Sequence, residues 1–133
     1  MKNIIKLAIL LSCLFAFNLN TFAEETENTQ ALDGTDITYV YTSGRSYNVK
    51  FEKDGLSYRY LTGSKPEIWW GPFPYQAIRI NEYTYFASWF EKGYGDYVTL
   101  LLNFNENKLH GSAVLRGEEV HFHSAEIVSV NKP

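Results

Sequence analysis

From Asp36 to the end of the chain, apolar and polar residues alternate with a period close to two, which is the spacing of β-strands. The segment RSYNVKFEKDG (45–55) is the clearest case. Tyr47, Val49 and Phe51 would lie on one face of a strand, and the polar residues between them would lie on the other. This alternation predicts a chain built almost wholly from half-buried strands.

Eight strand-like segments can be recognised, and short turns separate them. In chain order they are ITYVYT, RSYNVKFEKDG, LSYRYLTG, QAIRIN, YTYFASWFE, DYVTLLLNFN, KLHGSAVLR and EVHFHSAEIVSV. The turns carry Asp54-Gly55, Asn81-Glu82, Lys92–Gly95, Glu106-Asn107 and Gly117-Glu118. Because consecutive strands usually pair, we predict an all-β, eight-stranded antiparallel meander that closes into a barrel. An open β-sandwich is the alternative.

Tyrosine is frequent in this chain, with ten residues, and aromatic residues make up 17% of the sequence. A buried phenol needs a hydrogen-bond partner, so a tyrosine-rich interior suits a pocket wall better than a solid core. A barrel of eight strands either packs solid or holds one small ligand. The sequence therefore favours a hollow barrel, although many of the tyrosines could instead lie outside.

The first residues have the pattern of a secretory signal peptide. A basic start precedes the apolar run Leu7–Phe17, which is shorter than the ~20 residues of a membrane-spanning helix. We expect residues 1–23 to be removed after Ala23, and the protein to be periplasmic or secreted. Lipoprotein processing at Cys13 is the less favoured alternative, because the apolar run continues beyond it.

The remaining chain would consist of a flexible acidic leader, residues 24–35, and a barrel domain, residues 36–133. Residues 24–133 contain ten Lys and Arg, fifteen Asp and Glu, and no cysteine, so their net charge is −5. This balance argues against nucleic acid and against anionic membrane surfaces as partners. Without disulfides, the hydrophobic core alone must stabilise the domain. The oligomeric state stays open.

The strand YTYFASWFE ends in a carboxylate. Tyr85, Ala87, Trp89 and Glu91 share one face of this strand by their spacing. Glu91 would be either a solvated strand end beside Lys92 or an acid held in an aromatic pocket. In a pocket, lost hydration would raise the carboxyl pKa and make Glu91 able to donate a proton near neutral pH.

Three segments together resemble a known family. They are YVYTSGRSY (39–47), YRYLTG (58–63) and SWFEKGYGDYVTLLLNFNENKLHG (88–111), within a resemblance that covers residues 38–115. They are similar to the phenolic acid decarboxylases, which are small lipocalin-like barrels of the calycin superfamily, and to the related MoaF-like barrel domains. The resemblance implies a calycin barrel with a ligand pocket.

The resemblance also implies roles for individual residues. In those enzymes a Tyr-x-Tyr pair and an arginine hold the substrate carboxylate, and a glutamate protonates the double bond of a 4-hydroxycinnamic acid without any cofactor. By position the tyrosines fall on Tyr39 and Tyr41, and the glutamate falls on Glu91. The arginine does not carry over, because its place is taken by Ile68.

Without that arginine, a neutral, mainly aromatic ligand suits the expected pocket better than a free carboxylate, which needs a positive partner. Arg59 and Arg79 could replace it, but alternation places both outside. The proline-rich segment WWGPFPY (69–75) should be an irregular rim or lid, with Trp69 toward the interior.

The histidines do not predict a metal site. His121 and His123 lie two apart on a predicted strand, a spacing that can bind a metal. However, Val120 and Phe122 are the more natural core residues, so we expect both histidines outside. His110 should also point outward. We therefore expect no metal and no cofactor.

Three functional hypotheses follow. The first is an exported barrel that binds a small aromatic or apolar ligand in its interior. The second is a cofactor-free decarboxylase-type lyase in which Glu91 donates the proton while Tyr39 and Tyr41 orient the substrate. The third is an interaction or assembly protein whose interior is filled. For the first hypothesis the expected ligand-binding residues are Tyr39, Tyr41, Trp69, Tyr85, Trp89 and Glu91.

Overall fold

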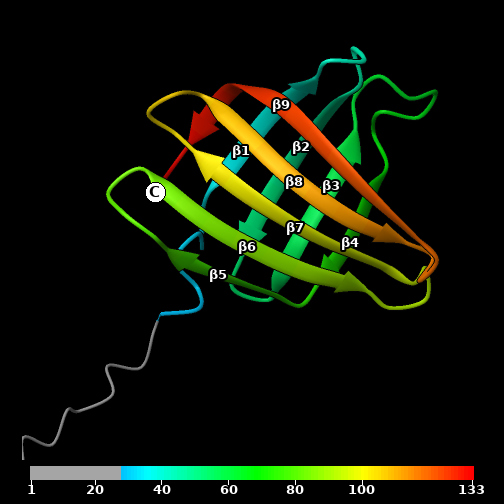
Figure 1. The fold of residues 1–133 in the computed structure, drawn as a ribbon, viewed down its shortest axis with the longest axis horizontal. Helices are drawn as coiled ribbons and strands as arrows, with labels where there is room; N and C mark the ends of the chain where they lie inside the picture. The colour runs from blue at the N-terminus through cyan, green and yellow to red at the C-terminus, as the bar shows by residue number, and fades with distance from the viewer. Residues whose placement is uncertain (1–27) are drawn as a thin grey trace, which may run out of the picture.

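A computed structural model describes residues 28–133, which form a nearly closed antiparallel barrel (Figure 1). The strands are β1 (Asp36–Tyr41), β2 (Ser46–Glu52), β3 (Gly55–Tyr60), β4 (Trp69–Phe73), β5 (Tyr75–Arg79), β6 (Thr84–Glu91), β7 (Asp96–Asn103), β8 (Lys108–Leu115) and β9 (Glu119–Asn131). Their order is β4-β3-β2-β1-β9-β8-β7-β6-β5. The all-β prediction is confirmed, and residues 28–133 contain no helix that could span a membrane. The expected signal peptide lies outside the described residues.

The barrel has nine strands, so the prediction of eight is wrong. The additional strand is β4, which lies in the segment that we expected to be an irregular rim. It pairs with β3, where Phe73 lies opposite Leu56 and Trp70 lies opposite Tyr58. Pro72 is tolerated because β4 is an edge strand, whose outer side needs no ladder donor.

The chain changes partner at Pro74, and this change creates the seam of the barrel. β4 pairs only with β3, and β5, which follows it directly, pairs only with β6. No backbone ladder joins β4 to β6, although the two strands are in contact. The barrel is therefore nearly closed, with its seam between β4 and the second half of β6.

Residues 29–35 cover the free edge of β5, contrary to the expected flexible leader. The Ala31 N–H donates to the Ala77 carbonyl at 3.1 Å, and the Ala77 N–H donates to the carbonyl of residue 29 at 2.8 Å. Leu32 is only 1% exposed and belongs to the core. The polar, acidic composition of the segment did not predict this position. One buried leucine and a few backbone hydrogen bonds are enough to hold the segment against β5.

The core fills one end of the barrel. Its largest fully buried side chains are Phe51, Leu32, Ile37, Leu56, Leu100, Leu102 and Leu109. Most lie near the strand ends next to the β2–β3 and β7–β8 turns. Each contributes about 1.5–3 kcal/mol by leaving water. Aromatic and polar side chains occupy the other end of the barrel instead.

Candidate functional site

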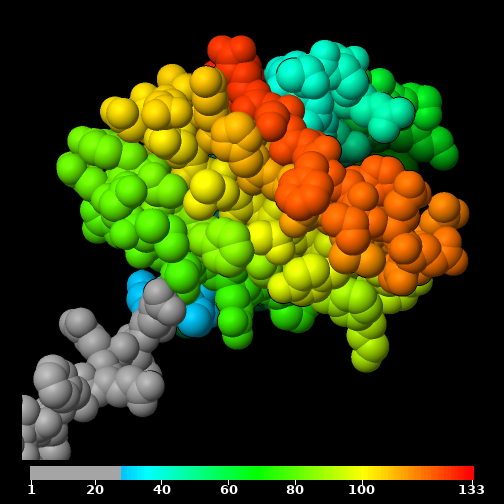
Figure 2. Space-filling view, in the orientation of Figure 1, coloured from blue at the N-terminus to red at the C-terminus, as the bar shows by residue number. Residues whose placement is uncertain are grey.

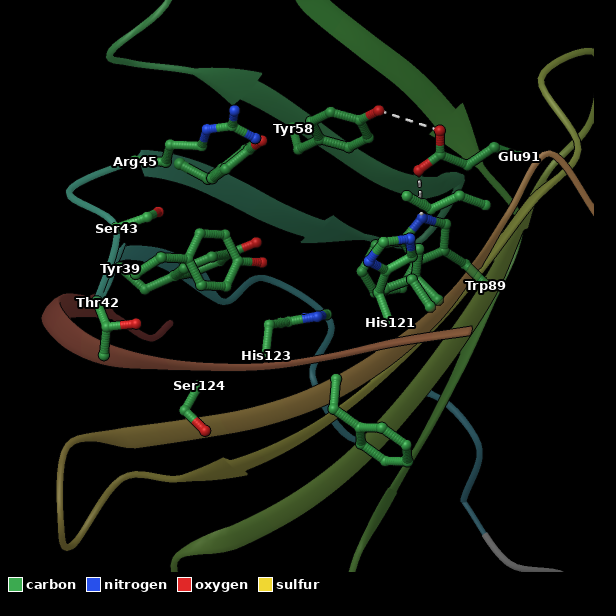
Figure 3. Close-up of a pocket in the computed structure, with 16 residues that line it drawn as sticks. Tyr39, Thr42, Ser43, Arg45, Tyr58, Trp89, Glu91, His121, His123 and Ser124 are labelled. Carbon is green, nitrogen blue, oxygen red and sulfur yellow. Dashed lines mark hydrogen bonds between the residues drawn. The ribbon is translucent and has the colours of Figure 1, made fainter. Parts of the chain in front are cut away.

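A cavity of about 460 Å³ opens at the other end of the barrel, next to the β1–β2, β6–β7 and β8–β9 loops (Figure 3). Its aromatic and aliphatic wall includes Tyr39, Tyr41, Tyr47, Tyr58, Trp89 and Val98. Its ionisable polar groups besides the tyrosines are Arg45, Glu91, His121 and His123. The barrel is thus filled at one end and hollow at the other.

Glu91, the last residue of β6, is buried in the wall of this cavity. It is 4% exposed, and both carboxylate oxygens accept a hydrogen bond. Trp89 Nε1 donates to one oxygen at 3.0 Å, and the Tyr58 hydroxyl donates to the other at 3.0 Å (Figure 3). Glu91 is therefore not a solvated strand end. The alternation along β6 put its carboxylate on the same inner face as Tyr85 and Trp89.

Burial raises the pKa of Glu91 above its ordinary value. The hydrogen bonds from Trp89 and Tyr58 act in the opposite direction because they favour the ionised form, and the negative charge of Asp96 raises the pKa again. The Tyr58 hydroxyl can donate to a carboxylate or accept from a carboxylic acid, so it suits both protonation states. Glu91 can therefore exchange a proton without losing its partners.

The hydrogen bond from Tyr58 to Glu91 also has a structural role. Tyr58 lies on β3 and Glu91 on β6, so the bond crosses the seam at which β4 and β6 share no ladder. Tyr94, in the β6–β7 loop, contacts Trp70 and Phe73 of β4 across the same seam, with ring centroids 5.6 and 6.5 Å apart. These side chains close the barrel where the backbone does not.

Four tyrosines form a continuous aromatic wall on β1, β2 and β3. The ring of Tyr39 lies 5.3 Å from that of Tyr41 and 5.8 Å from that of Tyr47, and Tyr47 lies 6.3 Å from Tyr58. Burial raises the pKa of Tyr39 well above its ordinary value and that of Tyr41 to about 12. Both phenols therefore keep their protons at neutral pH and can donate hydrogen bonds.

The histidines of β9 lie on the opposite face from the one predicted. His121 and His123 line the cavity, whereas Val120 and Phe122 are 62% and 85% exposed. His110 on β8 is exposed, as predicted, and its Nδ1 lies 2.9 Å from the hydroxyl of Ser124. The assumption that the apolar residues of β9 would face the interior was therefore wrong.

Small residues on β8 explain this orientation. Gly111 pairs with His123, and Ala113 pairs with His121, so the inner face of β8 leaves room for two imidazole rings. A Cβ atom on Gly111 would lie 2.7 Å from Leu100 Cδ2 and would also crowd the His123 ring. The glycine therefore allows His123 to point inward. Gly111 in the sequence was the signal that could have predicted this orientation.

His123, in the wall of the cavity, has an unpaired ring nitrogen that packs over Gly111. Its Nε2 is buried and has no hydrogen-bond partner among residues 28–133. Burial lowers the pKa of His123, as does the neighbouring His121, so the ring is neutral at pH 7. Its ring packs edge-on against Tyr41 at 5.1 Å. A buried polar atom without a partner costs free energy, and a bound ligand could supply the missing hydrogen bond.

Arg45 is the cation that the sequence reading missed. It follows the β1–β2 turn and lines the mouth of the cavity (Figure 3). Arg59 and Arg79 lie outside as predicted: the first donates to Asn48 Oδ1 at 3.1 Å, and the second donates to the Asn81 carbonyl. A loop residue between two cavity-lining tyrosines, Tyr41 and Tyr47, would have been the signal.

Trp69 does not point into the barrel. Its ring packs against two cations on the outer face, the Lys50 ammonium at 4.6 Å and the Arg59 guanidinium at 4.9 Å from the ring centroid. Trp70 is the residue paired with the cavity-lining Tyr58, and it is 39% exposed. The choice between adjacent tryptophans depended on strand register, which the prolines obscured.

Tyr85 also lies away from the cavity, although it shares the inner face of β6. It is 9% exposed, packs against Phe104 at 5.4 Å between ring centroids, and belongs to the filled end. Four of the six expected ligand residues therefore line the cavity together: Tyr39, Tyr41, Trp89 and Glu91.

Within residues 28–133, no three His, Cys, Asp or Glu side chains gather where they could hold a metal ion. His121 has one acidic neighbour, Glu119, whose Oε2 lies 3.3 Å from its Nε2 at the exposed start of β9.

Comparison with known proteins identifies a shared fold but does not assign the chain to a family. No family model matches the chain, and no curated protein matches it. Among solved structures, the barrel is similar to a protein of Burkholderia vietnamiensis described as a "putative beta-lactamase", with a TM-score of 0.62 and 16% identity. The match covers 73% of this chain and 93% of the other. At this identity the likeness shows the shared fold alone.

Proposed function

We propose that this protein binds one small aromatic molecule in the cavity at the hollow end of its barrel. The observation that carries the proposal is a cavity of about 460 Å³ whose wall combines an aromatic surface with a few convergent polar groups. Ligand sites commonly have volumes of ~300–1,000 Å³ and this mixture of apolar wall and placed polar atoms.

The wall suggests how the ligand would lie. An aromatic ring would be held between the tyrosines of β1 and β2 and the indole of Trp89, where edge and stacked contacts are favourable. The unpaired His123 Nε2 offers one hydrogen bond, and Arg45 offers a positive charge at the mouth. The ligand can therefore carry a polar or anionic group, contrary to the expectation of a neutral molecule.

The proposal also includes the protein family and the cellular location. The calycin and MoaF-like relationship is supported by the antiparallel barrel and by the joint presence of Tyr39, Tyr41 and Glu91 in one cavity. Export to the periplasm or the medium is supported by the basic, apolar and small-residue pattern of residues 1–23. We infer an exported lipocalin-like binding protein.

Fluorescence of Trp89 tests binding directly. A Trp69→Phe, Trp70→Phe background leaves Trp89 as the only tryptophan, and it lies in the cavity wall. Titration with phenols, indole and aromatic carboxylates should give a saturable change for at least one class. Ala113→Phe, which fills the cavity, should abolish the change, whereas Val40→Phe on the outward side of β1 should preserve it.

A flat response across the whole panel would contradict the proposal and favour an interaction protein. A response that persists in the Ala113→Phe variant would place the ligand elsewhere. Unfolding of each variant should be measured in parallel, so that lost binding is separated from lost structure.

A second candidate is a cofactor-free lyase, and one observation favours it: a buried glutamate with a raised pKa shares the cavity with Tyr39, Tyr41 and Arg45. Arg45 and the tyrosines would hold the carboxylate of a 4-hydroxycinnamic acid. Neutral Glu91 would protonate the double-bond carbon that bears the carboxylate. The bond to the carboxylate would then break, its electron pair would restore the double bond, and carbon dioxide would leave.

Ultraviolet absorbance of p-coumaric or ferulic acid during incubation with the protein tests this candidate. Loss of the substrate band that disappears in Glu91→Gln would support the lyase. Unchanged spectra at high protein concentration would exclude it while leaving the binding proposal intact.

A further inference from the structure

The outward face of β6–β9 lacks charge over its central part. On β6, every second residue from Phe86 to Phe90 points outward. Each of these three residues lies in a row with one outward residue of β7, one of β8 and one of β9, so the three rows contain twelve positions. Residues 28–133 include 22 Asp, Glu, Lys and Arg, and none of them occupies these positions. We call this surface the β6–β9 face; Figure 2 shows it toward the viewer.

Large side chains on this face are exposed to solvent. They are Phe86, Phe90, Tyr97, Leu101, Val120 and Phe122, with exposed fractions between 38% and 85%. The outer side of β1–β3 is different, since Asp36, Lys50, Glu52 and Arg59 project from it. An apolar exterior is therefore a property of one side of the barrel and not of the barrel as a whole.

We propose that a second copy of this chain packs against the β6–β9 face and forms a symmetric dimer. Sheets pack face to face about 10 Å apart, and a two-fold axis places the same surface on both partners. The net charge of residues 24–133 is −5, so two copies repel each other in general. This uncharged face is where they can approach without bringing carboxylates together.

The edge of the face is compatible with self-association. Lys108 and Glu126 lie directly opposite each other in the β8–β9 ladder and bound the face at the filled end of the barrel. A two-fold axis would bring both signs of charge from one copy toward both signs from the other. An anionic membrane is the weaker partner for an acidic chain.

The size of the face is in the range of a dimer interface. The four aromatic side chains Phe86, Phe90, Tyr97 and Phe122 are 41%, 50%, 47% and 85% exposed, which is roughly 450 Å² at about 200 Å² per side chain. Leu101, Val120 and the Ser and Thr hydroxyls add to this area. The sum approaches the ~800 Å² per partner of a standard interface.

Sedimentation velocity and light scattering on the purified protein test the proposal. The expected result is a concentration-dependent dimer. Phe122→Glu should raise the dimer dissociation constant by about 100-fold or more, because it places two carboxylates inside the interface. Since Phe122 is 85% exposed, the monomer should keep its circular dichroism spectrum and melting temperature. Val128→Glu, 56% exposed on the same strand but beyond Glu126, is the matched control and should remain dimeric.

The proposal does not depend on ligand binding: Phe122 and Ser124 of the face also border the cavity, but Phe86 does not, so Phe86→Glu tests the face without touching the cavity. A wild-type protein that stays monomeric up to about 100 μM would overturn it. So would a dimer that both Phe122→Glu and Phe86→Glu leave intact. Flotation of a monomeric protein with phosphatidylcholine vesicles, lost in Phe122→Glu, would assign the face to a lipid surface instead.

Discussion

Replacing Glu91 by glutamine should leave the barrel folded while removing one pH-dependent loss of stability. The carboxylate accepts from Trp89 Nε1 and from the Tyr58 hydroxyl, each at 3.0 Å. A glutamine amide can keep both contacts, because its oxygen accepts from the indole and its NH₂ group donates to the phenol oxygen. In acidic solution, where Glu91 is neutral, we expect the two proteins to differ by less than about 1 kcal/mol.

The difference should then change with pH in a defined direction. Because burial raises the pKa of Glu91 above 4.5, the native state holds this proton more strongly than the unfolded state does. The resulting stability is fully present below pH 4.5 and is lost as the pH rises through the raised pKa. The slope can reach about 1.4 kcal/mol per pH unit. Glutamine cannot ionise, so Glu91→Gln should become progressively more stable relative to the wild type between acidic and neutral pH.

Urea unfolding followed by tryptophan fluorescence, at half-unit steps of pH, measures this difference. Other titrating groups cancel, since both proteins share them. Glu91→Leu is the control for the hydrogen bonds: it leaves the buried indole N–H without a partner, and because neither variant ionises it should be about 1–3 kcal/mol less stable than Glu91→Gln at every pH. A Glu91→Gln difference that stays constant with pH would refute the buried, proton-binding state of Glu91. A Glu91→Leu variant as stable as Glu91→Gln would refute the hydrogen-bonded geometry.

Three further predictions concern packing and the cavity wall. Gly111→Ala should destabilise the barrel by about 1–3 kcal/mol in thermal unfolding, because the added methyl would lie 2.8 Å from the Thr99 carbonyl oxygen and 2.7 Å from Leu100 Cδ2. Leu32→Ala should cost about 2–5 kcal/mol in urea unfolding if residues 29–35 belong to the core, whereas a flexible leader would give no change. His123→Phe should leave the unfolding free energy within about 1 kcal/mol while weakening binding of any ligand found with the wild type by about 10-fold, and unaltered affinity would remove Nε2 from the site.

Where one strand alternated without interruption, the sequence sufficed to predict which residues face the interior. On β6 the inward set of Tyr85, Ala87, Trp89 and Glu91 follows directly from the period of two, and all four are buried. The position of Tyr85 along the barrel axis did not follow. Which end is hollow depends on the side chains contributed by all the other strands, and a single-strand pattern contains no information about them.

On β9 the same reasoning failed, because it assumes that the outer face of a strand is polar and the inner face is apolar. Val120 and Phe122 are apolar yet exposed, and His121 and His123 are polar yet face the cavity. In addition, the pairing of β9 with β1 shifts register between Thr38 and Tyr39 of β1. The two halves of β9 therefore do not follow one continuous inward–outward alternation. Both departures occur at surfaces for which we propose binding, where local rules are expected to break.

β4 escaped prediction for a different reason. Its pairing with β3 is irregular between Leu56 and Tyr58, and Pro72 interrupts the donor pattern. Edge strands tolerate such breaks because only one side needs a ladder. Sequence periodicity identifies strands that are paired on both sides more reliably than strands at a seam.

The seam leads to a last inference about Glu91. If the side chain served only to join β3 to β6 through Tyr58 and to hold Trp89, a glutamine would do so without the free-energy cost of ionisation at neutral pH. A carboxylate at this position therefore destabilises the barrel slightly and gains nothing for its closure. Proteins keep such a cost where a group has a chemical task, such as proton transfer or recognition of a ligand. Closure explains why Glu91 is buried and hydrogen-bonded, and the role that we propose for the cavity would explain why it is an acid.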